Sequence, residues 1–127
     1  MRIGVTGSSG FLGSHLTKAL RQYTDAEITV LQRNSSENFP TINELGSFVH
    51  DLNLIYHIAG VNRGTNEEIF RGNVEATFNL VEAIKKSKSS SPRIVFTSSS
   101  QVYKPLAQSR KIINESHKAE PATLFGV

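Results

Sequence analysis

Three glycines at three-residue spacing, Gly7, Gly10 and Gly13, form the first pattern in the chain that indicates chemistry. They follow a short β-branched apolar segment, residues 2–6, and precede an amphipathic segment, residues 11–23. Between a strand and a helix, such glycines permit a tight turn, close approach of the backbone to a pyrophosphate, and packing of the helix on the strand. The helix N-terminus then faces the phosphates. The spacing therefore favours a dinucleotide-binding turn over a purely structural turn of an α/β protein.

Other residues are expected to extend this site. The turn is predicted to contact the dinucleotide through Gly7, Ser9, Gly10, Phe11, Leu12 and Gly13. The backbone around Ala59, Gly60 and Val61 is expected to pass the adenosine and its ribose, where glycine admits close approach. His57, just before them, is interpreted as a buried structural residue rather than a catalyst.

The segment after the second expected strand carries a signal for the choice of cofactor. An acid there would accept hydrogen bonds from the 2′-hydroxyl of NAD and repel a 2′-phosphate. Residues 31–35 contain no acid and instead supply Arg33 and Asn34, which can neutralise and hydrogen-bond a phosphate. This favours NADP(H) over NAD(H), the alternative being that Arg33 is a solvated loop residue.

The elements that position these residues alternate along the chain. Apolar segments bounded by turn residues predict strands, and apolar residues at three- and four-residue spacing predict helices. The strands are expected at 2–6, 27–31, 52–59 and 93–97, and the helices at 11–23, 42–49 and 65–85. This alternation predicts an α/β fold of the Rossmann type, a doubly wound parallel sheet with strand order 3-2-1-4. Its ligand crevice is expected at the carboxyl ends of the strands, beside the first.

The composition excludes several classes of function. There are no cysteines, and the four histidines are scattered, so neither disulfides nor a metal site is expected. The net charge of +3 lacks the aromatic interleaving of single-strand nucleic-acid binders, so no nucleic-acid partner is expected. No apolar run approaches the ~18 residues of a membrane span, and the N-terminus does not resemble a signal peptide. A cytoplasmic location without membrane contact is expected.

Four segments resemble, in order, motifs of the extended short-chain dehydrogenase/reductases, the NAD-dependent epimerase/dehydratase family. Residues 6–13 are similar to its TGxxGxxG fingerprint, residues 57–60 to its HxAG strand end, residues 73–77 to its NVxxT helix and residues 98–103 to its SSxxVY segment. The stretch His57 to Arg63 is also similar to HLAGVNRP in capsular-polysaccharide reductases and epimerases that act on UDP-linked amino sugars.

The resemblance implies roles for individual residues. Asn73 and Ser98 are expected to join the cofactor-binding set, and Ser99 is the candidate for orienting a substrate hydroxyl. Phe125 occupies the place of the family's proton-transferring tyrosine, and the partner lysine would fall beyond Val127. Because a phenyl ring cannot transfer a proton, this chain alone is expected to be inactive.

Three functions are therefore open. The chain resembles part of a nucleotide-sugar epimerase, dehydratase or reductase, but it is also compatible with a non-catalytic NAD(P)-binding module or a dimerisation module, since residues 67–86 resemble a dimer-forming helix. One Rossmann domain is expected over residues 1–127, truncated before the later strands and without a substrate-binding part. An open edge at the fourth strand and uncovered apolar helix surface would favour a homodimer.

Overall fold

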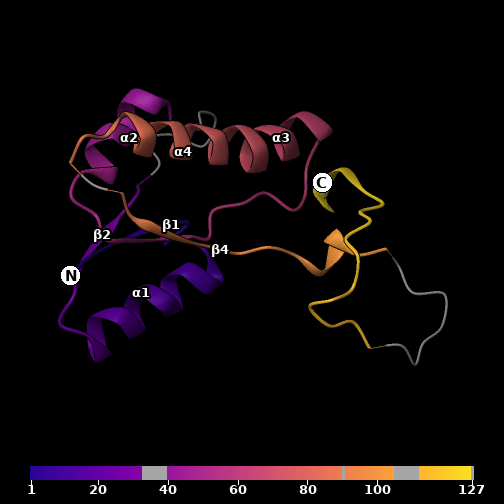
Figure 1. Ribbon diagram of the computed structural model, residues 1–127, viewed down its shortest axis with the longest axis horizontal. Coiled ribbons are helices and arrows are strands. Elements are labelled where there is room, and N and C mark those ends of the chain that lie inside the picture. The colour runs from indigo at the N-terminus through magenta and orange to yellow at the C-terminus, as the bar shows by residue number, and fades with distance from the viewer. Residues whose placement is uncertain (33–39, 90, 105–111, 127) are drawn as a thin grey trace. The chain divides into compact units, whose positions relative to one another are not determined.

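The computed structural model describes residues 1–32, 40–89, 91–104 and 112–126, which form two compact units, Met1–Thr97 and Ser98–Val127. A four-stranded sheet and its helices make up the first unit, and two short 3-10 turns belong to the second (Figure 1). The elements are β1 (Arg2–Thr6), α1 (Phe11–Tyr23), β2 (Glu27–Val30), α2 (Ile42–Val49), β3 (Leu54–His57), α3 (Asn66–Phe70), the π-helical turn η1 (Arg71–Glu75), α4 (Ala76–Lys86), β4 (Arg93–Phe96), η2 (Ser100–Val102) and η3 (Leu124–Gly126).

The sheet is parallel throughout, with the strands in the order β2-β1-β3-β4. Val5 of β1 lies between Val30 of β2 and Tyr56 of β3. On the far side of β3, His57 pairs with Phe96 of β4. The predicted α/β fold with a Rossmann-type parallel sheet is thereby confirmed.

The strand order differs from the predicted 3-2-1-4 in the position of the third strand. That strand was expected outside the second, yet β3 pairs with β1 on the opposite side. The reason is burial: Ile55 of β3 is fully buried, and an apolar strand is most stable in the centre of a sheet, where both faces are covered. Among the described residues, the order is that of a 3-2-1-4-5 Rossmann sheet without its outer third strand.

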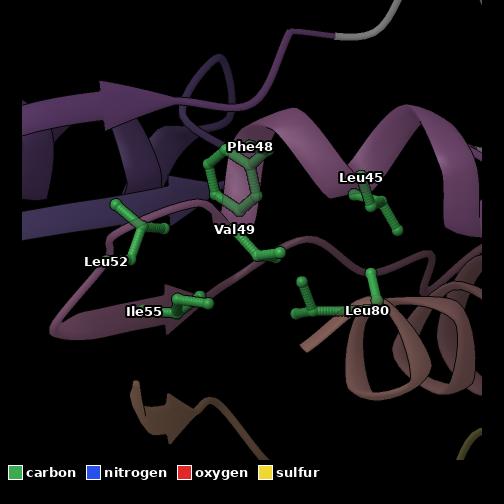
Figure 2. Close-up of a cluster of buried hydrophobic side chains, with 7 residues drawn as sticks. Leu45, Phe48, Val49, Leu52, Ile55 and Leu80 are labelled. Carbon is green, nitrogen blue, oxygen red and sulfur yellow. The ribbon is translucent and has the colours of Figure 1, made fainter. Parts of the chain in front are cut away.

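Helices cover both faces of the sheet (Figure 1). Helices α2 and α4 pack on one face, where the buried cluster consists of Leu45, Phe48, Val49, Leu52, Ile55, Leu80 and Ala83 (Figure 2). Helix α1 packs on the other face, where the cluster consists of Ile3, Val5 and Leu20. Full burial of one such aliphatic side chain stabilises the fold by about 1.5–3 kcal/mol, so these two clusters hold the layers together.

Helix α1 packs on the sheet through part of its predicted apolar face, Leu16 and Leu20, while its other large apolar residues lie at the surface. Phe11, Leu12 and Tyr23 recur at helical spacing with Leu16 and Leu20 in the sequence, but they are 85%, 52% and 76% exposed. The residues that α1 buries are Gly13, Thr17 and Leu20. Two of these are small, so the helix axis approaches the sheet closely and the larger side chains are left at the surface.

Apolar side chains are also exposed on the last helix and strand of the sheet unit. Phe70 and Phe78 are 50% and 59% exposed on the helical stretch from α3 to α4. All four residues of β4 are exposed, Phe96 among them. The expectation of uncovered apolar surface on the helix and the fourth strand is thereby confirmed.

Candidate functional site

A cavity of about 700 Å³ opens in the sheet unit at the carboxyl ends of β1 and β3. Its wall includes Thr6 to Gly13, Val30 to Gln32 and His57 to Val61. Gly72 and Ala76, from the helical stretch above, close another side. The volume falls in the range of small-molecule sites, about 300–1,000 Å³. The crevice therefore lies where the strand order predicts it, beside the first strand.

The three glycines of the turn differ in what surrounds them. Gly7 has φ +71°, and a Cβ there would stand 2.7 Å from the Ala59 nitrogen. A Cβ on Gly13 would stand 2.1 Å from the Gly7 carbonyl oxygen. A Cβ on Gly10 would meet only that same oxygen, at an ordinary 3.4 Å. The fold itself therefore requires glycine at positions 7 and 13, whereas at position 10 the chain leaves open space.

The N-terminus of α1 differs from those of α2 and α3. Thr41 and Thr65 cap α2 and α3 by accepting hydrogen bonds from the backbone N–H groups of Glu44 and Glu68. Helix α1 begins after Gly10, without a side-chain cap and without an acid in its first turn. The first N–H groups of a helix have no partner within it, and they carry partial positive charge. At α1 these groups border the cavity.

The part of the cavity wall formed by Ile58 and Ala59 is held by a buried polar network around His57, which is 3% exposed. Its Nδ1 lies 2.7 Å from Thr6 Oγ1, and its Nε2 lies 3.0 Å from Thr77 Oγ1. Thr6 Oγ1 also accepts hydrogen bonds from the backbone N–H groups of Ile58 and Ala59, each at 3.2 Å. Burial lowers the pKa of the His57 imidazole, because a charged ring would lose its hydration. His57 thus has the structural surroundings that its sequence position predicts.

Asn73 fixes the next part of this wall from the π-helical turn η1. Its Oδ1 accepts a hydrogen bond from the Val61 N–H at 3.0 Å. Its Nδ2 donates to the Val61 carbonyl at 2.7 Å and to the Ile69 carbonyl at 2.9 Å. A Cβ on Gly60 would stand 2.9 Å from Oδ1. Both amide hydrogens of Asn73 are therefore committed to the protein, so the side chain supports the loop rather than offering a donor to a ligand.

The end of β2 contributes Val30, Leu31 and Gln32 to the cavity wall. None of these side chains is acidic, so no carboxylate stands at this point of the described chain. Arg33 and Asn34, the residues from which NADP(H) is predicted, lie outside the described residues. Their proposed role stays a prediction.

Ser99 and Phe125 both lie in the second unit, on neighbouring turns. Ser99 Oγ accepts a hydrogen bond from the Gln101 N–H at 3.2 Å and so caps η2. Turn η3, which contains Phe125, packs on η2: Thr123 donates a hydrogen bond to the Gln101 side chain at 3.1 Å, and a Cβ on Gly126 would stand 2.2 Å from the Gln101 carbonyl oxygen. Within this unit, Ser99 caps η2 and Phe125 lies on η3, the turn that packs against η2. Ser98, just before, is exposed.

The described part of the chain contains neither a cluster of metal ligands nor a membrane-spanning helix. No group of three or more His, Asp or Glu side chains there is arranged to hold a metal ion. No helix there is both long enough and apolar enough to span a membrane.

The parallel sheet, with a cavity at the carboxyl ends of its strands and a glycine turn entering α1, defines a Rossmann-type domain. Comparison with known proteins identifies the family. Residues 3–127 match the model of the NAD dependent epimerase/dehydratase family. The chain belongs to this family.

Curated and solved relatives give this family membership more detail. The chain is 34% identical over 102 residues to UDP-2-acetamido-2,6-beta-L-arabino-hexul-4-ose reductase from Pseudomonas aeruginosa, a match that covers 80% of this chain and 26% of the reductase. RMD from Pseudomonas aeruginosa, complexed with NADPH, is 25% identical with a TM-score of 0.77, over 98% of this chain and 44% of that one. UDP-glucuronic acid 4-epimerase from Bacillus cereus, in complex with UDP-glucuronic acid and NAD, has a TM-score of 0.80 at 22% identity, over 99% of this chain and 48% of that one.

The chain thus spans less than half the length of each of these relatives. The resemblance of residues 57–63 to reductases of UDP-linked amino sugars agrees with the name of the curated relative. Both solved relatives hold a nicotinamide cofactor, NADPH in one and NAD in the other.

Proposed function

We propose that this chain is the nicotinamide-cofactor-binding domain of a nucleotide-sugar epimerase, dehydratase or reductase. The observation that carries the proposal is the contrast among the glycines of the turn. A side chain at position 7 or 13 would clash with backbone atoms of the protein itself. Beside Gly10, at the uncapped start of α1, there is open space. A cofactor pyrophosphate fits that space and the partial positive charge around it.

The residues of the cavity suit a dinucleotide. The N–H groups of Phe11 and Leu12 would bind the pyrophosphate, with Ser9 beside them. The adenosine and its ribose would lie along Ala59 to Val61, where Asn73 and Gly60 keep the backbone in place. When bound, the nicotinamide ring supplies the acceptor or donor of a hydride for a sugar carbinol or keto group.

The proposed cofactor is NADP(H) rather than NAD(H). Positions 31 and 32 are leucine and glutamine, so the acidic side chain that usually accepts hydrogen bonds from the 2′-hydroxyl of NAD is missing there. The guanidinium of Arg33 would bind a 2′-phosphate through two parallel hydrogen bonds. Affinity for NADPH is therefore expected to exceed affinity for NADH, and Arg33→Ala is expected to remove the difference.

A second candidate function, cofactor binding without turnover, is favoured by Phe125. A phenyl ring has no proton to give, and general acid–base help contributes about 10²–10⁴-fold to rate. Ser99 retains a hydroxyl that could orient a substrate, but it cannot replace the missing acid. The unmodified chain is therefore proposed to bind cofactor and to lack redox activity with nucleotide sugars.

The two candidate functions are tested by two measurements on the same protein. Fluorescence titration with NADPH is expected to give saturable binding. Turnover of NADP(H) with a panel of UDP-sugars is expected to be absent in the unmodified chain, and Phe125→Tyr, which restores the phenol hydroxyl, is the matched variant. Failure of the folded chain to bind NADPH or NADH would contradict both candidates, and turnover by the unmodified chain would contradict the second.

A further inference from the structure

The hydrogen bonds around Thr6 fix the direction of its hydroxyl proton. A threonine hydroxyl has one hydrogen and two acceptor lone pairs. The N–H groups of Ile58 and Ala59 act only as donors, so together they occupy both lone pairs of Thr6 Oγ1. The hydroxyl hydrogen must then point to the remaining neighbour, Nδ1 of His57, at 2.7 Å. Nδ1 is therefore an unprotonated acceptor.

The other side of the ring gives the same answer independently. Thr77 donates its hydroxyl hydrogen to the Asn73 carbonyl oxygen at 2.5 Å. Its Oγ1 can therefore only accept from His57 Nε2, which lies 3.0 Å away. Both ends of the network thus require the neutral imidazole with its hydrogen on Nε2. The chain of donors runs in one direction, from Thr6 through His57 and Thr77 to the π-helical turn.

Neither the opposite tautomer nor the charged ring suits this network. A hydrogen on Nδ1 would need a lone pair of Thr6 Oγ1, which would displace the N–H of Ile58 or Ala59. No charged side chain in the described part of the chain contacts the imidazole: Thr6 faces it from β1, Thr77 from α4, and the Phe96 ring from β4 at a centroid distance of 5.7 Å. Nothing there would stabilise a positive charge in place of the lost hydrogen bonds.

The two N–H groups that depend on this arrangement belong to the wall of the cavity. Ala59 packs directly against the glycine turn, residues 7–13, which is here called the phosphate turn: its nitrogen is the nearest atom to a Cβ built on Gly7. Ile58 and Ala59 both line the cavity. We infer that His57 is a positioning residue that must stay in the neutral Nε2–H tautomer to hold the Ile58–Ala59 backbone against the phosphate turn. Protonation of His57 releases this backbone and weakens cofactor binding, a consequence that rests on the function proposed above.

The first test does not involve the cofactor. Long-range ¹H–¹⁵N correlation spectra of the imidazole rings at pH 8 should show His57 with a hydrogen-bearing Nε2 and an unprotonated Nδ1, its signals assigned with His57→Asn. His15 is an internal contrast, because its Nδ1 lies 2.7 Å from the Phe11 carbonyl oxygen and must be the donor in that bond. In the free protein, the backbone amide signals of Ile58 and Ala59 should shift with the titration of His57. A hydrogen on Nδ1 of His57, or amide signals that ignore its titration, would overturn the inference.

The second test measures NADPH affinity between pH 8 and pH 5. His57→Asn is the matched variant, because its Oδ1 can still accept from Thr6 but does not titrate. The 2′-phosphate of NADPH titrates near pH 6 in both proteins, so the difference between their profiles isolates His57. Acidification should weaken binding by the unmodified chain about tenfold more than by His57→Asn, and His50→Gln, which replaces an exposed histidine, should behave like the unmodified chain.

Identical profiles for the unmodified chain and His57→Asn would overturn the coupling to affinity. If the folded chain does not bind NADPH at pH 8, the proposed function fails, and the nuclear magnetic resonance data still decide the tautomer and its hold on the backbone. If His57→Asn does not fold, Thr77→Val serves instead: it removes the acceptor at Nε2 and should lower the population of the Nε2–H tautomer.

Discussion

The sharpest prediction separates folding from binding within the glycine turn, using Gly13→Ala and Gly10→Ala. A methyl group at position 13 would stand 2.1 Å from the Gly7 carbonyl oxygen and 2.9 Å from the Ser8 Cα, all of it backbone that cannot rotate away. Overpacking of this kind costs up to about 3 kcal/mol. Alanine gains back about 1 kcal/mol in helix propensity within α1. The net loss is therefore up to about 2 kcal/mol.

At position 10 the same substitution has almost no steric effect on the protein. The nearest atom is 3.4 Å away, and φ of −77° suits any residue. Alanine is a poorer N-cap than glycine by about 0.5 kcal/mol, but it restricts the unfolded chain by a similar amount. The stability of Gly10→Ala is expected to stay within about 0.5 kcal/mol of the unmodified chain. The methyl group would instead fill the space proposed for the pyrophosphate and reduce NADPH affinity at least about tenfold.

Urea unfolding followed by circular dichroism gives the stabilities, and fluorescence titration gives the affinities. The expected result is a cross-over: Gly13→Ala loses stability, and Gly10→Ala loses binding while remaining folded. The reasoning is refuted if Gly10→Ala binds NADPH as tightly as the unmodified chain. It is equally refuted if Gly13→Ala is as stable as the unmodified chain, because the turn would then not be packed as described.

Three further predictions concern the supports of the site. Asn73→Ala should lower the free energy of unfolding by about 1–3 kcal/mol in urea, because it leaves the part-buried backbone N–H of Val61 without its acceptor; an unchanged urea midpoint would contradict a supporting role of Asn73. Thr65→Ala removes the cap of α3 and should lower it by about 1 kcal/mol, with Thr65→Ser as the control that retains the cap. Burial lowers the pKa of His57 from 6.5, so the free energy of unfolding should be constant above pH 6.5 and should fall as the pH drops below it. The hydrogen bonds from Thr65 lower the pKa of Glu68, so a second loss of stability is expected below pH 4.5. A midpoint that is constant from pH 8 to pH 4 would contradict both shifts.

Local sequence patterns predicted the parts of the fold that depend on neighbours in the chain. The glycine spacing, the alternation of strands and helices and the buried His57 all follow from short-range signals. The position of β3 does not, because strand order depends on which apolar strand has both faces covered. The apolar sequence around Ile55 predicts that the strand is buried, but it does not show which strands lie beside it. The predicted helix over 65–85 likewise gives no sign of the π-helical turn at Asn73, whose partner Val61 lies 12 residues earlier, in the loop before the helix.

The face that a helix buries was also hard to predict from residue size. Phe11 and Leu12 look like core residues, yet α1 packs through Gly13, Thr17 and Leu20. A glycine spaced three and four residues from other small or apolar side chains was the available signal for a close helix–sheet contact. The glycine motif, by contrast, already implied three different roles, and the structure adds that Gly10 is the glycine beside open space.

The central claim is that the turn from Gly7 to Gly13 binds a nicotinamide dinucleotide. The most direct measurement is a ¹H–¹⁵N correlation spectrum of the backbone amides during titration with NADPH. We expect saturable shifts that are largest at Gly7, Gly10, Phe11 and Leu12 and along Ala59 to Val61, with small shifts elsewhere in the sheet unit. A folded chain whose amide signals in this turn stay in place at millimolar NADPH would contradict it.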